Sequence, residues 1–226
     1  MKSLVFPSLI ALVGLASIIG FETQSVKAEE TQDIQSLKDP QAIEAFRENF
    51  LKNFKRIGLN TAYNDAQFLR IMVESSSAKR GLEIGSCNGY GAMFMGMGFE
   101  RNGGQLVTLE IDPKFVKECR ENLKKTGLEK TVECVEGDAL KTIPELQGEF
   151  DFVFIDAQKQ DYYKYFKAVS PKLKAGAVIV ADNVIQYAEA MKDFLDAMKN
   201  DPAYDTVIIQ TTQEKRDGMS VTYKRR

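Results

Sequence analysis

The sequence predicts an α/β fold, in which a doubly wound, mostly parallel sheet carries an antiparallel edge strand at its C-terminal end. Short apolar runs alternate with helical stretches along most of the 226 residues, which is the pattern of repeated βαβ units. Two of these runs, FDFVFI and AVIVA, are almost entirely apolar, as expected of strands covered on both faces. A glycine-rich segment follows the first run, where such folds turn from strand to helix.

The N-terminal segment has the pattern of a targeting signal. Residues 4–21 carry no charge, follow Lys2 and give way to small and polar residues up to Ala28. This order is typical of a secretory signal peptide cleaved after Ala28, and the run is also just long enough for an uncleaved membrane anchor. We therefore expect residues 1–28 to be a signal or anchor and residues 29–226 to form one domain. The protein is then exported or anchored through this segment alone, or cytoplasmic if the segment does not act.

Two helices are predicted before the first strand. Apolar residues recur at steps of three and four within residues 33–57, which predicts an amphipathic helix with one apolar face. A second helix is expected from Ala62 to about Ser77, with Asn60 or Thr61 as its N-cap.

The alternating elements then follow in order. Strands are expected at 80–84, 106–110, 131–135, 150–155 and 176–181, and helices at about 90–100, 113–126, 139–147 and 159–173. A last helix at about 188–199 precedes two strands, YDTVIIQ and MSVTYK, that flank Arg216-Asp217-Gly218. Because Asp-Gly is a common hairpin turn, these strands are predicted to pair antiparallel.

Composition excludes several kinds of chemistry. The chain has no histidine, so imidazole-based nucleophile systems, proton relays and zinc sites of the HExxH type are excluded. Lys plus Arg number 30 and Asp plus Glu number 32, a net charge of −2, which argues against a nucleic-acid partner. The three cysteines, Cys87, Cys119 and Cys134, have neither zinc spacing nor the even number of a disulfide framework.

The chemistry is expected at the carboxyl ends of the strands, where open α/β sheets bind ligands. The loop Glu83–Gly91 has the spacing GxxxGxG and not the GxGxxG of nicotinamide-dinucleotide proteins. Glu110 ends the second strand, where a carboxylate can accept hydrogen bonds from two ribose hydroxyls, whereas Asp112, before Pro113, is expected to cap the next helix. Asp138 either contacts an adenine amino group or caps its helix.

Three oxygen ligands are predicted to meet at two neighbouring strand ends. Asp156 follows one strand, and Asp182 and Asn183 follow the next. Carboxylate and amide oxygens suit a hard divalent cation, Mg²⁺ above all. Lys159 follows Asp156 by one helical turn and is the candidate general base in a chain without histidine.

The motifs LEIGSCNGYG, TLEID, EGDAL, FDFVFIDAQKQDYYKYF and VIVADNV, in this order, resemble those of the cation-dependent class I O-methyltransferases related to catechol and caffeoyl-CoA O-methyltransferases. The resemblance spans about 53–223 and implies S-adenosylmethionine as the methyl donor and a small hydroxylated acceptor of the vicinal-diol or catechol type. It implies that the cofactor contacts Thr61, Glu83, Gly85, Ser86, Gly89, Glu110, Asp138 and Ala139. It also implies Asp156, Asp182 and Asn183 as the metal ligands and Lys159 as the base.

Some features depart from that family. Gln158 replaces a frequent acid, only Val184–Tyr187 separates Asn183 from the next helix, and there is no tryptophan to form an aromatic gate. Three alternatives therefore stay open: a tRNA hydroxyuridine methyltransferase relative, an NAD(P)-binding oxidoreductase, and an inactive module that binds S-adenosylmethionine. A homodimer is equally left open.

We predict that residues 1–28 are dispensable for folding, because the amphipathic helix within 33–57 closes the domain without them. A chain beginning at Glu29 is expected to be soluble and to unfold in one cooperative thermal transition, followed by circular dichroism with the full-length chain as control. Aggregation of the shorter chain, relieved by restoring residues 1–28, would show that the apolar run belongs to the core.

Overall fold

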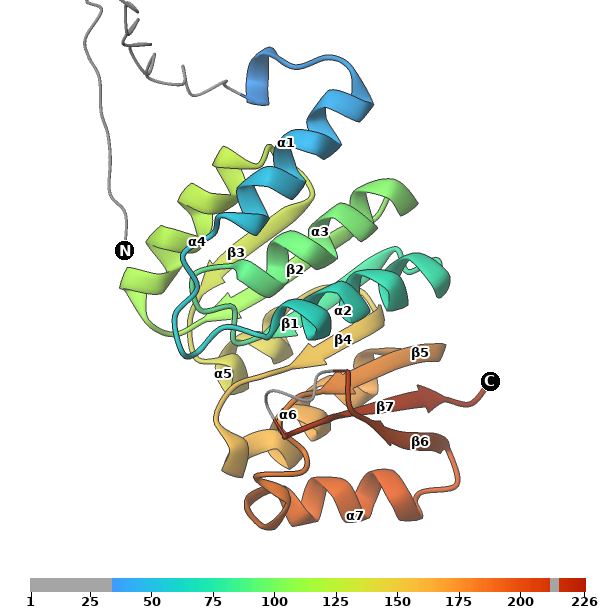
Figure 1. Cartoon of the computed structure of the whole chain (residues 1–226). Helices are drawn as coiled ribbons and strands as arrows, with labels where there is room; N and C mark the ends of the chain where they lie inside the picture. Colours follow the sequence, from blue (N-terminus) through green and yellow to red (C-terminus); the bar gives the residue numbers. More distant parts are fainter. Residues whose placement is uncertain (1–33, 212–215) are drawn as a thin grey trace, which may run out of the picture. The chain divides into compact units, whose positions relative to one another are not determined.

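A seven-stranded sheet organises the part of the chain that the computed structural model describes, residues 34–211 and 216–226 (Figure 1). The order of its strands is β3-β2-β1-β4-β5-β7-β6. The predicted signal or anchor, residues 1–28, lies outside the described residues. Among the described helices, none combines the length and the apolar character needed to cross a bilayer.

The strands confirm the predicted fold class. They are β1 (Arg80–Ile84), β2 (Gln105–Glu110), β3 (Val132–Glu136), β4 (Phe150–Ile155), β5 (Leu173–Ala181), β6 (Tyr204–Ile209) and β7 (Met219–Lys224). Strands β1 to β5 pair in parallel, and β7 pairs antiparallel with both β5 and β6. The last strand therefore lies between β5 and β6, and the two edge strands of the sheet are β6 and β3.

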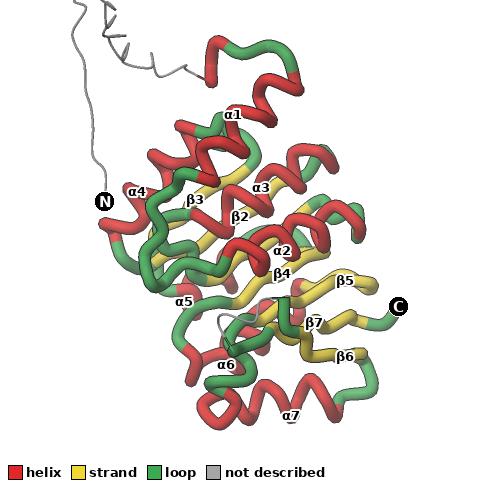
Figure 2. Tube along the Cα trace, viewed as in Figure 1, coloured by secondary structure: helices red, strands yellow, loops and turns green. Residues whose placement is uncertain are grey.

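The helices cover both faces of this sheet, as Figures 1 and 2 show. They are α1 (Pro40–Lys52), α2 (Tyr63–Ser75), α3 (Tyr90–Asn102), α4 (Pro113–Lys125), α5 (Ala139–Glu145), α6 (Tyr162–Val169) and α7 (Lys192–Asn200). Helices α1 to α4 contribute to one hydrophobic cluster and α5 to α7 to a second. Along β4, Phe152 and Phe154 belong to the first cluster, and Val153 and Ile155 to the second, as the two-residue period of a strand requires.

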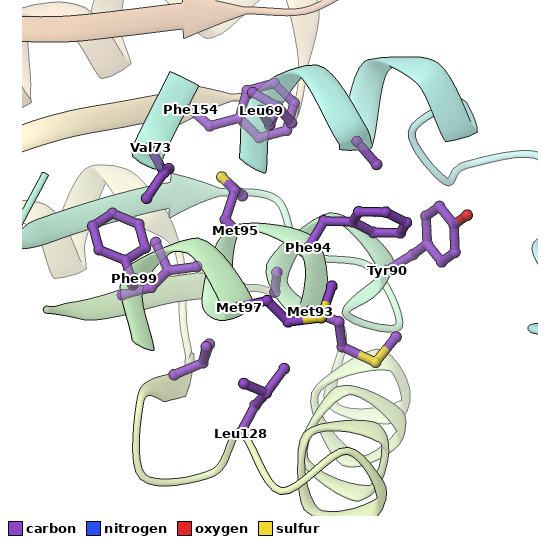
Figure 3. Packing of buried hydrophobic residues seen from close by; sticks show 14 of the residues in the cluster. Leu69, Val73, Tyr90, Met93, Phe94, Met95, Met97, Phe99, Leu128 and Phe154 are labelled. Atoms are coloured by element: carbon purple, nitrogen blue, oxygen red, sulfur yellow. The ribbon is translucent and has the colours of Figure 1, made fainter. Parts of the chain in front are cut away.

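Helix α3 is buried almost all round. Ten of its residues, from Tyr90 to Phe99, are buried, and Figure 3 shows its methionines packed among side chains of neighbouring elements. Gly98 allows this close packing, because a Cβ there would lie 3.2 Å from the carbonyl oxygen of Arg70 on α2. The helix that starts behind the glycine loop is thus fixed against both α2 and the sheet.

The first helix is shorter than its apolar period predicted. Within residues 33–57, α1 covers Pro40–Lys52. The Asp39 carboxylate caps its start by accepting from two backbone amides. Its end is set by Asn53, whose side-chain Nδ2 donates to the carbonyl of Asn49 at 2.9 Å and so satisfies a terminal backbone group.

The predicted N-cap of the second helix is wrong. Helix α2 is preceded by Ala62, which makes no side-chain cap. Asn60 instead accepts from the Ile57 amide at 2.8 Å and donates to Asn88 Oδ1 at 2.7 Å, while Thr61 is buried. Asn60 thereby ties the segment before α2 to the glycine-rich loop after β1.

The predicted helix over 159–173 is split into three pieces. A 3₁₀ turn at Lys159–Asp161 leads into α6, and a second turn at Ser170–Lys172 follows it. Pro171 lies in the second turn, and a proline lacks the N–H that a continuing helix would need. Strand β5 consequently begins at Leu173, earlier than expected.

A fully buried acid lies in an interior strand of the sheet. Glu83 on β1 is 1% exposed, and its Oε2 accepts from the Thr108 hydroxyl at 2.6 Å. Burial is the main cause that raises the pKa of Glu83, from 4.5 to about 8, against the opposing effect of the Thr108 hydrogen bond. The carboxyl therefore stays protonated in the folded chain at neutral pH.

This acid is expected to make stability depend on pH. Between about 4.5 and 8 the folded chain binds a proton that the unfolded chain has released, so stability falls as pH rises, by at most about 1.4 kcal/mol per pH unit. The neutral variant Glu83→Gln keeps an acceptor for Thr108 and should lose this dependence. Urea unfolding of both proteins at pH 5 and pH 9 measures the difference. Equal pH responses would contradict the prediction.

Candidate active site

A cavity of about 790 Å³ opens at the carboxyl ends of β1 to β5. The loops that follow these strands line it, and the loop after β5 contributes as far as Gln186 and Tyr187. Gly58–Asn60, before α2, complete the lining. Figure 2 shows such loops, in green, at one end of the strands. The sequence predicted the chemistry at these strand ends.

The glycine-rich loop approaches its neighbours too closely for larger residues. Gly85 has a φ of +93°, and a Cβ on it would lie 2.3 Å from the carbonyl oxygen of Asp156. Gly89 has a φ of +88°, and a Cβ there would lie 2.8 Å from Cys119 Sγ. Both positions therefore require glycine. Of these two, Gly85 lines the cavity and Gly89 does not.

Glu110 links this loop to the end of β2. Its Oε2 accepts from the Cys87 amide at 2.7 Å, and its Oε1 accepts from the amides of Ile111 and Asp112 at 2.8 and 2.9 Å. The residue is 9% exposed and lines the cavity. Each carboxylate oxygen has two acceptor sites, so Glu110 can also accept from a ligand hydroxyl while the loop holds it in place.

Asp112 and Asp138, for which the sequence analysis considered a helix-cap role, both cap helices. Asp112 accepts from the Lys114 amide at 2.8 Å, with Pro113 at the first position of α4, as predicted. Asp138 accepts from the Leu140 amide at 3.0 Å and caps α5. Asp138 and Ala139 also line the cavity, and their contact with an adenine ring stays a prediction.

Three predicted cofactor contacts lie behind the cavity wall. Thr61, Glu83 and Ser86 are buried and are not among the residues that line the cavity. Thr61 and Glu83 lie near Gly91, where a Cβ would come 3.4 Å from the threonine Oγ1 and 2.9 Å from the glutamate Oε1. Their side chains thus lie against the first turn of α3, and neither lines the cavity.

The predicted metal and base residues lie together. Asp156, Lys159, Asp182 and Asn183 all line the cavity. Lys159 Nζ donates to Asp156 Oδ1 at 2.7 Å, and the backbone amide of Asn183 donates to Asp182 Oδ1 at 2.7 Å. In residues 34–211 and 216–226, no group of three or more His, Cys, Asp or Glu side chains is arranged to hold a metal. A cation here would depend on the two carboxylates, the Asn183 amide and further oxygens from water or substrate.

Tyr162 is a member of this cluster whose role the sequence analysis missed. Its hydroxyl accepts from Lys159 Nζ at 2.9 Å and donates to the Asp182 carbonyl at 3.1 Å. Burial is the largest cause that raises the pKa of Tyr162 well above 10.0, so the phenol stays neutral. The spacing of three residues between Lys159 and Tyr162, about one helical turn, was the sequence signal for this contact.

Asp217 is a second missed residue, although the predicted antiparallel pairing of the strands on either side of it, β6 and β7, is confirmed. Strand β6 ends at Ile209 and β7 begins at Met219, so Asp217-Gly218 lies near the end of a longer connection. Asp217 is 2% exposed and accepts from Asn183 Nδ2 at 3.0 Å. Burial alone would raise the pKa of Asp217, but hydrogen bonds from the Gln186 amide, from Asn183 and from further amides lower it. No sequence spacing indicated this contact.

Comparisons with known proteins support the motifs. The family model described as O-methyltransferase matches residues 33–218. A catechol O-methyltransferase from Mycobacterium tuberculosis is 34% identical over 83% of this chain and 90% of its own length, and one from Niastella koreensis is 34% identical over 64% and 65%. A crystal structure of an O-methyltransferase from Bacillus cereus in complex with SAH is 26% identical, with a TM-score of 0.71 over 85% of this chain and 94% of that one. The chain therefore belongs to the S-adenosylmethionine-dependent O-methyltransferase family.

Proposed function

We propose that the protein methylates one hydroxyl of a small molecule with two adjacent hydroxyls, of the catechol type, and that it requires a divalent cation, Mg²⁺ above all. The observation that carries the proposal is the meeting of two sets of residues in one cavity. Gly85 and Glu110 are the proposed cofactor contacts, Asp156 and Asp182 the proposed cation ligands and Lys159 the proposed base, and all five line this cavity. Two curated relatives named catechol O-methyltransferase support this class of acceptor.

The residues present fit a hard cation. Asp156, Asp182 and Asn183 offer two carboxylates and an amide oxygen, the donor types that Mg²⁺ prefers. When bound, the cation would lower the pKa of an acceptor hydroxyl. The carboxylates also face a cavity that must hold the positive sulfonium of the cofactor, which they attract.

Lys159 is the proposed general base. Asp156 Oδ1 and the Tyr162 hydroxyl hold its amine at 2.7 and 2.9 Å beside the predicted metal ligands. In its neutral form Nζ accepts the hydroxyl proton as the acceptor oxygen attacks the methyl carbon. The carbon–sulfur bond breaks in the same step as the oxygen–carbon bond forms, and its electron pair leaves with the sulfur, which becomes a neutral thioether. Holding oxygen, methyl and sulfur in line supplies much of the rate.

Within the part of the chain that the structure describes, exposed apolar side chains line the cavity near the proposed cation ligands. Four residues, Val184–Tyr187, join the metal ligand Asn183 to the turn before α7. Tyr187 is 48% exposed and Leu59 is 66% exposed, and both line the cavity. An apolar, open rim suits a small, flat aromatic acceptor, which can be held between such side chains.

Methyl transfer is expected to depend on the cation and on Asp182. With Mg²⁺ and a panel of vicinal diphenols, the wild type should form methyl ethers, and EDTA should abolish the reaction. Asp182→Ala should be inactive in both conditions and still bind S-adenosylmethionine, as measured by calorimetry, because Glu110 and the glycine loop are unchanged. Asp205→Ala, on exposed β6, is the control. Full activity of the wild type in EDTA would contradict the cation requirement.

Removal of the base is expected to slow turnover without loss of binding. Lys159→Ala should lower kcat by about 10²–10⁴, the usual contribution of a positioned general base. Lys167→Ala, an exposed lysine on α6, is the matched control. Steady-state kinetics with saturating Mg²⁺ and cofactor give kcat for both. A kcat for Lys159→Ala within threefold of the control would refute the role of Lys159.

A further inference from the structure

The two oxygens of the Asp217 carboxylate have different partners. Oδ1 accepts from three backbone amides, those of Ile185, Gln186 and Gly218, at 3.0, 3.0 and 2.8 Å. Oδ2 accepts from the side-chain Nδ2 of Asn183 at 3.0 Å. One oxygen thus anchors the loop after β5, and the other contacts the side chain of a predicted metal ligand. At 2% exposure, Asp217 is nearly closed to solvent.

This contact decides which way the Asn183 amide points. An ionised carboxylate can only accept hydrogen bonds, so the atom of the amide that faces Asp217 must be its NH₂ group. The carbonyl Oδ1 lies on the other side of the same planar group. Asn183 lines the cavity, and among the described residues no hydrogen-bond donor to this Oδ1 is found. The amide therefore presents an acceptor and not a donor to the cavity.

The backbone at Asn183 has an unusual conformation, and the same carboxylate contacts the residues that follow it. Asn183 has a φ of +63°, a left-handed conformation that is uncommon for residues other than glycine. The backbone amides of Ile185 and Gln186 donate to Asp217 Oδ1. One buried carboxylate thus contacts the backbone two and three residues after Asn183 as well as the side-chain amide of Asn183 itself.

We propose that Asp217 is a positioning residue that keeps the Asn183 carbonyl oxygen directed at the divalent-cation site. The proposal rests on the cation-dependent function proposed above and adds a residue that itself contacts neither cation nor substrate. If Asp217 could not accept from Asn183, the amide would be free to turn over and present its NH₂ group to the cavity. An NH₂ group cannot ligate a cation, so the site would lose one of its three protein oxygens.

The variant Asp217→Asn separates the two roles of the carboxylate. The new side chain keeps one oxygen to accept from the amides of Ile185, Gln186 and Gly218, and replaces Oδ2 with an NH₂ group. Two NH₂ groups cannot face each other in a hydrogen bond, so the Asn183 amide should turn over. The fold should be retained, and its melting temperature in EDTA reports on this. Asp205→Asn, at an exposed aspartate, is the matched control.

Cation binding is measured directly on the full-length chain, without turnover. Mn²⁺ is titrated into each protein and free Mn²⁺ is followed by electron paramagnetic resonance, with Mg²⁺ as competitor. Asp217→Asn is expected to weaken Mn²⁺ binding by about 10–100-fold, the usual effect of removing a residue that orients a metal ligand. Its affinity for S-adenosylmethionine, measured by calorimetry without metal, should match that of the control.

A second substitution tests the orientation itself. A carboxylate at position 183 has an oxygen on each side, so Asn183→Asp combined with Asp217→Asn restores a hydrogen bond between the two positions and an oxygen toward the cavity. The double variant should bind Mn²⁺ at least about tenfold more tightly than Asp217→Asn. Asn183→Asp alone places two carboxylates against each other and should be less stable than the double variant. The added carboxylate also strengthens cation binding by its charge, so this gain is compared with the gain that Asn183→Asp gives in the wild type. A purely structural role of Asp217 would make the two gains equal.

Each outcome supports or overturns the proposal. Wild-type affinity for Mn²⁺ in Asp217→Asn, or no recovery in the double variant, overturns the role of Asp217 and leaves the cation-dependent function standing. Absence of Mn²⁺ binding by the wild type overturns the cation requirement and, with it, this proposal. If Asp217→Asn alone does not fold, the double variant decides: its carboxylate at position 183 presents an oxygen to the cavity without help from Asp217, so it is expected to keep Mn²⁺ binding, and loss of Mn²⁺ binding in the double variant overturns the proposal.

Discussion

Backbone hydrogen bonds that continue the parallel ladder beyond the strands hold this site together. The Asp156 amide donates to the Ile84 carbonyl at 2.9 Å, and the Asp182 amide donates to the Ile155 carbonyl at 3.0 Å. The register pairs Ile84 with Ile155, and Ile155 with Ala181. The three strands therefore end side by side, and the first loop residue after each strand lies next to the first loop residue after its neighbour. Each loop is thereby attached to the strand beside it, and every side chain of the cavity depends on that register.

The charged side chains that line the cavity are mostly acidic. Lys159 has the one positively charged side chain among the described residues that line the cavity, and an ion pair with Asp156 holds it. The lining carboxylates include Glu110, Asp156 and Asp182. An acidic cavity attracts a cationic cofactor and a divalent cation. Because the chain has no histidine, the amine of Lys159 is the basic side-chain group among the described residues that line the cavity.

Much of the fold could be predicted from the sequence, because the signals were local. The apolar runs located β1 and β4 to the residue, and the Asp-Pro pair located the cap of α4. The elements that were predicted wrongly depend on competing partners. Asn60 did not cap α2, since it contacts Asn88 in a loop that is distant in the sequence, and α1 ended early because the Asn53 side chain satisfied the helix end.

The sequence by itself determined the fold class, the family motifs and the strand ends at which polar residues gather, because the βα period and residue type carry that information. Only the tertiary structure decided which of those residues reach the cavity. Glu83 and Ser86 belong to the same motif as Gly85, yet they are buried beside it. Asp217 contacts Asn183 across 34 residues, a distance at which no periodic pattern acts, so only the packing of β7 beside β5 reveals the contact.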